Sequence, residues 1–364
     1  MRQNGQVALV AAHGPFTPNP QMTITTYRNL GRSGIKISPL TLGTMMFGGE
    51  TDRATAQRIT ERAFEQGVNF IDTANNYNRG ESEVVVGELI APRRGEWVLA
   101  SKFGNQNPGT AGPNDRGAAR INLIRSVEAS LKRLRTDYLD VLYLHREDGS
   151  TQIEETVRAL GDLIRAGKLR SYGLSNHRAY KLAEFVHTAD ALGVDRPAVT
   201  QPLYNLANRQ IEVEHLPAAE RYGLAVVPYS PLARGVLTAK YTPGEAPAAE
   251  PRAGRADPRL QQTEWRAESL HIAQQIRAHV AGRGITPGQF ALAWVLHNRL
   301  VTSAIAGPRT LAQWEDYLPA LQYRFTEEDE ALVDRLVPTG HASAPGFNDP
   351  AHPFFGRQPR HRAP

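Results

Sequence analysis

Short apolar runs rich in β-branched residues recur eight times between residues 40 and 306, and stretches with helical periodicity separate most of them. The runs are Leu40–Gly43, Val68–Asp72, Trp97–Ser101, Leu139–His145, Arg170–Leu174, Ala198–Gln201, Leu224–Pro228 and Thr302–Ala306. Strands buried on both faces read as continuous apolar runs, and alternation with helices imposes parallel pairing through right-handed crossovers. Eight such units predict an α/β protein built as a closed (β/α)8 barrel, with a doubly wound sheet as the competing arrangement.

The helical stretches and the glycines behind them mark the boundaries of the repeating unit. Amphipathic periodicity predicts helices over Ala54–Gln66, Arg120–Arg133, Glu154–Ala166, Tyr180–Leu192, Gln210–Tyr222 and Leu311–Leu321. Four of the strands have a glycine just ahead of them, after a helical stretch: Gly67, Gly167, Gly193 and Gly223. Glycine in this place favours a left-handed carboxyl-terminal cap, so a second signal supports the same boundaries.

Two of the connections are much longer than the others. Residues 102–119 follow the third strand, and residues 229–302 follow the seventh and include two further helical patterns, at 264–281 and 287–298. Both insertions start at the carboxyl end of a strand, which is the end that carries the active site in a barrel. We therefore expect both to cover a substrate, with Met45, Met46 and Phe47 completing the pocket wall.

The two ends of the chain lie outside the repeating pattern. Residues 22–340 are predicted to form the barrel, opened by an antiparallel hairpin with strands at 25–30 and 35–38. Because the strand pattern begins directly after Met22, residues 1–21 are expected to be a disordered extension or the result of an upstream start codon. Their one apolar run, Val7–Ala12, is too short for the core of a signal peptide. Residues 341–364 lack periodicity and are expected to wrap loosely over the surface or to be mobile.

Composition removes several classes of function. The chain has no cysteine, which excludes disulfides, thiolate nucleophiles and cysteine-ligated metals, and we expect no metal site. Its 42 basic and 37 acidic residues are dispersed, so no nucleic-acid partner is expected, and no apolar run is long enough to cross a membrane. P-loop, nucleophile-elbow and Rossmann fingerprints are absent from the sequence. These exclusions leave a protein that acts on a small molecule, and we expect it to be cytoplasmic.

Four proton-active residues follow three consecutive strands at the end where a barrel would gather them. Asp72 ends the second strand, Tyr77 lies five residues further on, Lys102 follows the third and His145 ends the fourth. Each also has a structural explanation, since the aspartate can cap a turn, the tyrosine can lie on a surface loop and the histidine can be a satisfied residue at the barrel mouth. The lysine fits a structural role least well, because buried lysines are rare unless they are paired.

Together the four residues suit the protonation of an oxygen that becomes an alkoxide. A phenol with an ordinary pKa near 10 is a poor acid at neutral pH, and a neighbouring ammonium lowers that pKa by stabilising the phenolate. We therefore expect Lys102 to lower the pKa of Tyr77, Asp72 to orient Lys102, and His145 to hydrogen-bond a carbonyl oxygen.

At these residues the sequence resembles the aldo-keto reductases of bacterial type, from about Tyr27 to about Leu336. The matching segments are residues 70–74 with Tyr77, 99–104, 138–141 with His145, 173–176, 228–235 and 307–310. The resemblance implies a TIM barrel that binds NADPH without a Rossmann fold and reduces an aldehyde or ketone by hydride transfer. It implies that Tyr77 is the general acid, that Lys102 and Asp72 tune it, and that His145 orients the carbonyl.

The same resemblance implies a set of cofactor-binding positions. They are Gly43, Thr44, Ser175, Asn176, Gln201, Tyr229, Ser230, Leu232, Arg234, Gly235, Gly307, Arg309, Thr310, Gln313 and Asp316. Ser175, Asn176 and Gln201 would hold the nicotinamide amide, and Tyr229 would stack on its ring unless it is simply a buried strand-end residue.

The phosphate end of the cofactor falls in the eighth unit. Arg309 would bind the 2′-phosphate and favour NADPH over NADH, unless it is only a solvated loop arginine, and Gly307 and Thr310 precede a helix whose amino terminus can receive an anion. The sequence departs from the family at Asp316-Tyr317, where Glu-Asn is usual, and at Asn78, where glycine often follows the tyrosine. Tyr317 is therefore left out of the expected site.

Three hypotheses on the function remain open. The first is an NADPH-dependent carbonyl reductase with a small-molecule carbonyl substrate. The second is a cofactor-binding regulatory subunit like the potassium-channel β chains, although residues 1–21 lack the basic amphipathic pattern of an inactivating segment. The third is the reverse reaction, oxidation of a sugar or polyol alcohol, which the same residues could serve. Arg234 or an arginine within residues 252–259 would meet an acidic substrate, or else belongs to a solvated loop.

Overall fold

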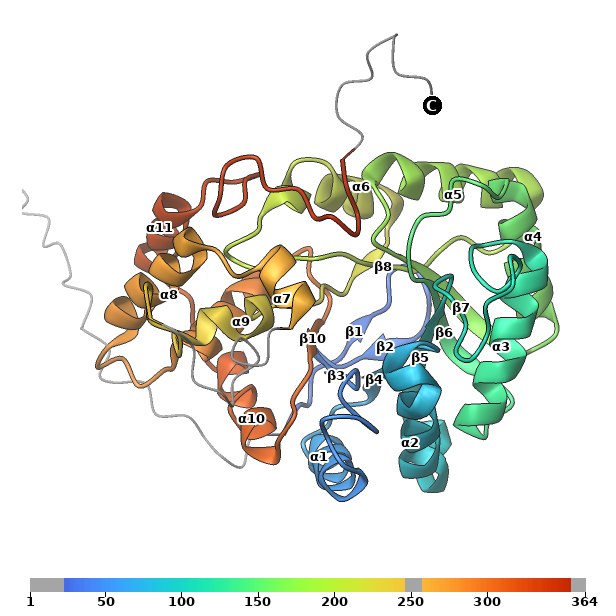
Figure 1. Cartoon of the computed structure of the whole chain (residues 1–364), viewed down its shortest axis with the longest axis horizontal. Coiled ribbons are helices and arrows are strands. Elements are labelled where there is room, and N and C mark those ends of the chain that lie inside the picture. The colour runs from blue at the N-terminus through green and yellow to red at the C-terminus, as the bar shows by residue number, and fades with distance from the viewer. Residues whose placement is uncertain (1–22, 246–256, 355–364) are drawn as a thin grey trace, which may run out of the picture.

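The computed structural model describes residues 23–245 and 257–354, and eight parallel strands form its centre (Figure 1). In their spatial order they are β10 (Ala304–Ala306), β3 (Leu40–Gly43), β4 (Phe70–Asp72), β5 (Val98–Phe103), β6 (Leu139–Leu144), β7 (Leu169–Ser175), β8 (Val199–Gln201) and β9 (Ala225–Val226). Two backbone hydrogen bonds close the ring, from Thr302 to the Val226 carbonyl at 2.8 Å and from Ile305 to the Pro228 carbonyl at 3.0 Å. The predicted (β/α)8 barrel is confirmed.

Helices surround the strands, as Figure 1 shows. They are α1 (Arg53–Glu65), α2 (Glu81–Ile90), α3 (Arg120–Leu134), α4 (Ile153–Arg165), α5 (Ala179–Leu192), α6 (His215–Tyr222), α7 (Pro258–Thr263), α8 (Ala267–Val280), α9 (Pro287–His297), α10 (Leu311–Glu315) and α11 (Glu327–Leu336). The apolar faces of these helices and the outer faces of the strands form one continuous core. The four predicted cap glycines all have positive φ, between 63° and 84°.

The amino-terminal hairpin closes one end of the barrel. Strands β1 (Arg28–Asn29) and β2 (Lys36–Ile37) pair antiparallel, as predicted but over fewer residues. Leu30 and Ile37 are fully buried against the side chains that fill the barrel interior, and Arg28 donates to the Val301 carbonyl at 2.9 Å. Only the opposite end, where the strands finish, is left for a site.

Two predicted helices are shorter than the sequence pattern indicated. The stretch 210–222 contains a 3₁₀ turn at Gln210–Glu212 and α6, and the stretch 311–321 contains α10 and a 3₁₀ turn at Leu318–Leu321. A proline causes both breaks, since Pro217 and Pro319 have no N–H to donate to the carbonyl four residues earlier. The hydrophobic periodicity of the sequence does not show that these backbone hydrogen bonds are missing.

The carboxyl-terminal segment is more ordered than predicted. The amides of Arg209 and Ser343 donate to the carbonyls of His341 and Ala207, each at 2.8 Å. Further along, Arg259 makes a bidentate ion pair with Asp349 at 2.9 and 2.7 Å. Residues 341–354 therefore follow α11 in specific contacts, and Ala351 and His352 reach the cavity (Figure 1). This corrects the expectation of a loose tail for residues 341–354, while residues 355–364 lie outside the described residues. The predicted extension 1–21 lies outside the described residues, and none of the helices within them is long and apolar enough to span a membrane.

Candidate active site

A cavity of about 830 Å³ opens at the carboxyl ends of the strands. It contains most of the residues predicted for the site: Gly43, Thr44, Asp72, Tyr77, His145, Ser175, Asn176, Gln201, Tyr229, Ser230, Leu232, Arg234, Gly235, Gly307, Arg309, Gln313 and Asp316. Lys102 lies fully buried behind the cavity wall, and Thr310 does not line the cavity. Met45 and Met46 form part of the wall, whereas Phe47, expected beside them, is buried in the core.

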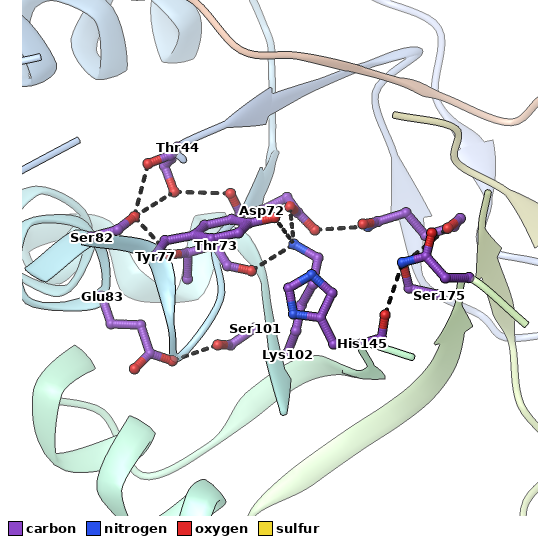
Figure 2. Close-up of polar contacts among 12 residues, drawn as sticks. Thr44, Asp72, Thr73, Tyr77, Ser82, Glu83, Ser101, Lys102, His145 and Ser175 are labelled. Atoms are coloured by element: carbon purple, nitrogen blue, oxygen red, sulfur yellow. Dashed lines mark hydrogen bonds and ion pairs between the residues drawn. The ribbon is translucent and has the colours of Figure 1, made fainter. Parts of the chain in front are cut away.

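The ammonium of Lys102 organises one end of the cavity (Figure 2). Its Nζ donates to Asp72 Oδ1, to the Thr73 carbonyl at 2.8 Å and to Tyr77 Oη at 3.2 Å. An ammonium has three protons, so these three acceptors use all of them. Adjacent strands supply the partners, because β4 and β5 are in register with Asp72 opposite Ala100. Asp72 is fixed from its other side by Gln201, whose Nε2 donates to Oδ2 at 2.9 Å.

The pKa of Tyr77 differs from the sequence-based expectation. Burial raises the pKa of the phenol, and the charge of Lys102 opposes that rise without overcoming it. Burial also lowers the pKa of Lys102, but Asp72 and Tyr77 together outweigh this effect, so the net pKa of Lys102 is raised and the ammonium form is retained. The expected net lowering of the Tyr77 pKa is therefore wrong for the protein without a ligand, because desolvation of the phenolate is the larger effect.

His145 is held as a neutral imidazole in one orientation. Burial and then the charge of Lys102 lower the pKa of His145 well below its ordinary value. The amide of Asn105 lies 3.0 Å from Nδ1 of His145, and its Nδ2 donates to that ring nitrogen. When Nδ1 accepts, the proton of the neutral ring is on Nε2. The rings of His145 and Tyr77 meet edge to face with centroids 5.9 Å apart, and both residues line the cavity.

A network of hydroxyl groups supports this cluster from behind (Figure 2). Ser82, at the start of α2, donates to the Thr44 carbonyl at 2.8 Å and lies 2.8 Å from the hydroxyl of Thr73. The hydroxyl of Thr44 donates to the Asp72 carbonyl at 2.9 Å. All of these side chains are buried. The ends of β3 and β4 are therefore joined by side-chain hydrogen bonds as well as by their ladder.

The wall opposite the cluster contains Tyr229 and Asn176. The Tyr229 hydroxyl donates to Asn176 Oδ1 at 2.7 Å, and Asn176 Nδ2 donates to the His145 carbonyl at 2.9 Å. These two hydrogen bonds tie the hydroxyl end of the Tyr229 ring to Asn176, and Asn176 to the backbone of His145. After Tyr229 the backbone is strained, since Ser230, Ala233 and Arg234 all have positive φ. Such strain in residues other than glycine is typical of functional loops.

The far end of the cavity lies in the eighth unit. Arg309 lines it and makes an ion pair with Glu50 at 3.2 Å. Thr310 caps the next turn instead, accepting from the Gln313 amide at 3.2 Å, and α10 spans only five residues. The side chain of Thr310 therefore binds one of the free amides of this helix terminus, and the predicted anion site there stays a prediction. Asp316 accepts from Gln289 at 2.7 Å, and burial raises the pKa of Asp316.

Several residues of the cavity were not predicted from the sequence. They are Asn76, Asn105, Gln106, Arg146, Pro231, Thr238, Lys240, Asp257, Leu292, Ile305, Ala306, Tyr317, Ala351 and His352, whereas Arg259 was one of the arginines expected to meet an acidic substrate. Ile305 and Ala306 belong to a predicted strand, and Tyr317 was set aside only because it departs from the family pattern. The carboxyl-terminal residues come from a segment whose sequence carries no periodic signal, so they could not have been found by pattern.

The fold and the cluster define a barrel with an acid–base site at the carboxyl ends of its strands. Residues 39–338 match the aldo/keto reductase family, so the chain belongs to that family, as the sequence resemblance indicated. Membership of this family implies oxidoreductase activity on small carbonyl compounds, and its members typically bind NADP(H).

Curated relatives cover most of the chain. It is 37% identical over 300 residues to a probable voltage-gated potassium channel subunit beta of Arabidopsis thaliana, which covers 81% of this chain and 90% of that protein. It is 35% identical to the uncharacterized oxidoreductase YrpG of Bacillus subtilis, over 86% of this chain and 96% of that one. It is 33% identical to norsolorinic acid reductase stcV of Emericella nidulans, over 89% and 84%.

Proposed function

We propose that the protein reduces an aldehyde or ketone to an alcohol with NADPH as the hydride donor and Tyr77 as the general acid. The observation that supports this most directly is the contact between Lys102 and Tyr77. Because Tyr77 Oη accepts from the ammonium at 3.2 Å, its own proton remains available to a ligand in the cavity. The Nε2–H of His145 is a second donor to the same oxygen.

The residues present fit NADPH. The cavity extends from Tyr77 to Asp316, with a planar aromatic wall at Tyr229 and a guanidinium at Arg309. Ser175 and Asn176 would hold the nicotinamide amide, Tyr229 would support the ring, and Arg309 would bind the 2′-phosphate. Gly43, Thr44, Gln201, Ser230, Leu232, Arg234, Gly235, Gly307, Gln313 and Asp316 would make the remaining contacts, and Thr310 would act only by capping its turn. When bound, NADPH supplies the hydride.

The protein's own side chains would then orient the carbonyl and supply the proton. His145 and Tyr77 orient the carbonyl oxygen, and Tyr77 transfers its proton to that oxygen as negative charge develops there. Lys102 remains an ammonium and stabilises the phenolate left behind, while Asp72 holds Lys102 in place. The same geometry serves oxidation of an alcohol in the reverse direction.

Titration with NADPH, followed by fluorescence, tests the cofactor, and loss of nicotinamide absorbance with a panel of aldehydes tests the reaction. Tyr77→Phe is expected to reduce kcat by about 10² to 10⁴-fold while NADPH still binds. Arg309→Ala is expected to abolish the preference for NADPH over NADH. If NADPH does not bind even at high concentration, the proposal is wrong.

The similarity to potassium-channel β subunits favours one other function, a cofactor-binding regulatory subunit. Both functions include NADPH binding, so the measurement that distinguishes them is the rate of carbonyl reduction. Turnover of a carbonyl that is lost in Tyr77→Phe supports the enzyme. NADPH binding with no turnover of any aldehyde supports the regulatory subunit.

A further inference from the structure

The acidic groups that line the cavity all have partners within the described residues. Asp72 is bound by Lys102 and Gln201, and Asp316 accepts from Gln289. Asp257 accepts from the two backbone amides that follow Pro258, at 2.9 and 3.0 Å, as the cap of α7. These acids therefore serve the protein's own structure.

The arginines of the cavity fall into two groups. Arg259 is paired with Asp349 and Arg309 with Glu50. Arg146 and Arg234 also line the cavity, but neither makes a hydrogen bond or an ion pair to any residue in the described ranges 23–245 and 257–354. A half-buried guanidinium without acceptors, as at Arg234, is unfavourable unless a ligand supplies them.

Arg146 is exposed at the cavity, and Arg234 is half-buried in its wall. Arg146 directly follows His145, and its charge contributes to the lowered pKa values of His145 and of His352 across the mouth. The charge of Arg234 acts on the pKa values of Tyr77 and Tyr229. Arg234 has φ 53°, so the strained loop after Tyr229 presents it to the cavity. Both arginines thus line the same cavity as Tyr77 and His145, which would bind the carbonyl oxygen.

We infer that the carbonyl substrate carries an anionic group, a carboxylate or a phosphate, which Arg146 binds together with Arg234. This inference rests on the proposed function and names the substrate class for it. A guanidinium presents a planar pair of donors that matches both anions. The proposed function also assigns Arg234 to the cofactor, whose phosphates are a second source of the same chemistry, whereas Arg146 is not among the cofactor contacts.

Matched pairs of substrates test the inference. We compare 4-carboxybenzaldehyde with methyl 4-formylbenzoate, and glyceraldehyde 3-phosphate with glyceraldehyde. For at least one pair kcat/KM should favour the anion, and Arg146→Gln should reduce that preference by about tenfold or more. Arg158→Gln removes the same charge from the exposed outer face of α4 and should leave the preference unchanged.

A binding measurement complements the rates. Calorimetry with 4-(hydroxymethyl)benzoate or glycerol 3-phosphate, for the pair that shows the preference, should give binding that weakens with salt and with Arg146→Gln. If the protein reduces both carbonyls of each pair with the same kcat/KM, this inference is wrong and the proposed function stands. If Arg146→Gln weakens NADPH binding and not the preference, the anion belongs to the cofactor and the inference is wrong. If no carbonyl is reduced, the proposed function itself fails.

Discussion

Tyr77 accepts a hydrogen bond from Lys102 across 3.2 Å while the lysine is fully buried and paired with Asp72. The phenol therefore has a cation beside its oxygen but remains protonated, since burial raises its pKa. The cation does not create a phenolate in the resting protein. Its effect appears when the proton leaves, because the negative charge then forms next to an ammonium in a site of low dielectric constant.

This arrangement predicts a specific pH profile for carbonyl reduction. The acid is active in its protonated form, and its pKa is raised, so kcat/KM should stay level through neutral pH. The fall should begin only above the ordinary tyrosine pKa of about 10. Lys102→Met removes the group that lowers the pKa of Tyr77, so the fall should move to higher pH while the rate at neutral pH decreases. A fall that moves to lower pH in this variant would contradict the assignment.

The control for this variant is Asp72→Asn combined with Lys102→Met. Lys102→Met alone leaves a buried carboxylate without its cation, which costs about 3 to 5 kcal/mol of stability. The double variant removes both charges and should recover most of the free energy of unfolding without recovering the rate. Equilibrium unfolding and kcat/KM, measured on the same preparations, separate the two effects.

The contact between Asn105 and His145 predicts the tautomer of the histidine. Nitrogen-15 NMR should find His145 neutral at pH 7 with its proton on Nε2, because Nδ1 accepts from Asn105. Asn105→Leu removes one hydrogen bond and should lower kcat by about tenfold. Asn105→Asp places a carboxylate beside the ring and should raise the pKa of His145. A proton on Nδ1 in the wild-type protein would show that the orientation is different.

The buried hydroxyl of Ser82 is expected to position the cluster. Ser82→Ala leaves the Thr44 carbonyl and the Thr73 hydroxyl each short of a partner, so the free energy of unfolding should fall by about 1 to 3 kcal/mol. Because the Thr73 carbonyl binds Lys102, the alkaline fall of the pH profile should also move. Ser269→Ala removes another buried serine, on α8, which does not line the cavity, and should reduce stability and leave the profile unchanged. Identical profiles in both variants would make Ser82 merely structural.

The barrel and its four central residues could be predicted because each depends on short-range signals. Continuous apolar runs define strands, and a polar residue that ends such a run must lie at the same mouth as its neighbours. The sign of the Tyr77 pKa shift could not be predicted, since it depends on how deeply the phenol is buried. Asn105, Arg146 and His352 also escaped prediction, because irregular segments bring them to the cavity through tertiary contacts alone.

Two buried histidines, His177 and His215, should make the fold sensitive to acid. His177 bonds the Ser175 carbonyl at 2.8 Å and His215 bonds the Thr200 hydroxyl at 2.9 Å. Burial lowers the pKa of each to about 4, below the ordinary value of 6.5.

The unfolded chain then binds more protons than the folded one between these values, so stability should fall as pH falls from about 6.5 towards 4, by up to about 3 kcal/mol for each histidine. The lowered pKa values of His145 and His352 add to the same slope. His215→Gln keeps a hydrogen-bonding side chain that does not titrate, so its free energy of unfolding should lose only the part of the slope that His215 contributes. Denaturant unfolding between pH 4 and 7 measures it, and the exposed His271 supplies the control in His271→Gln, which should retain the full slope. A slope that persists unchanged in His215→Gln would mean that another group governs the acid response.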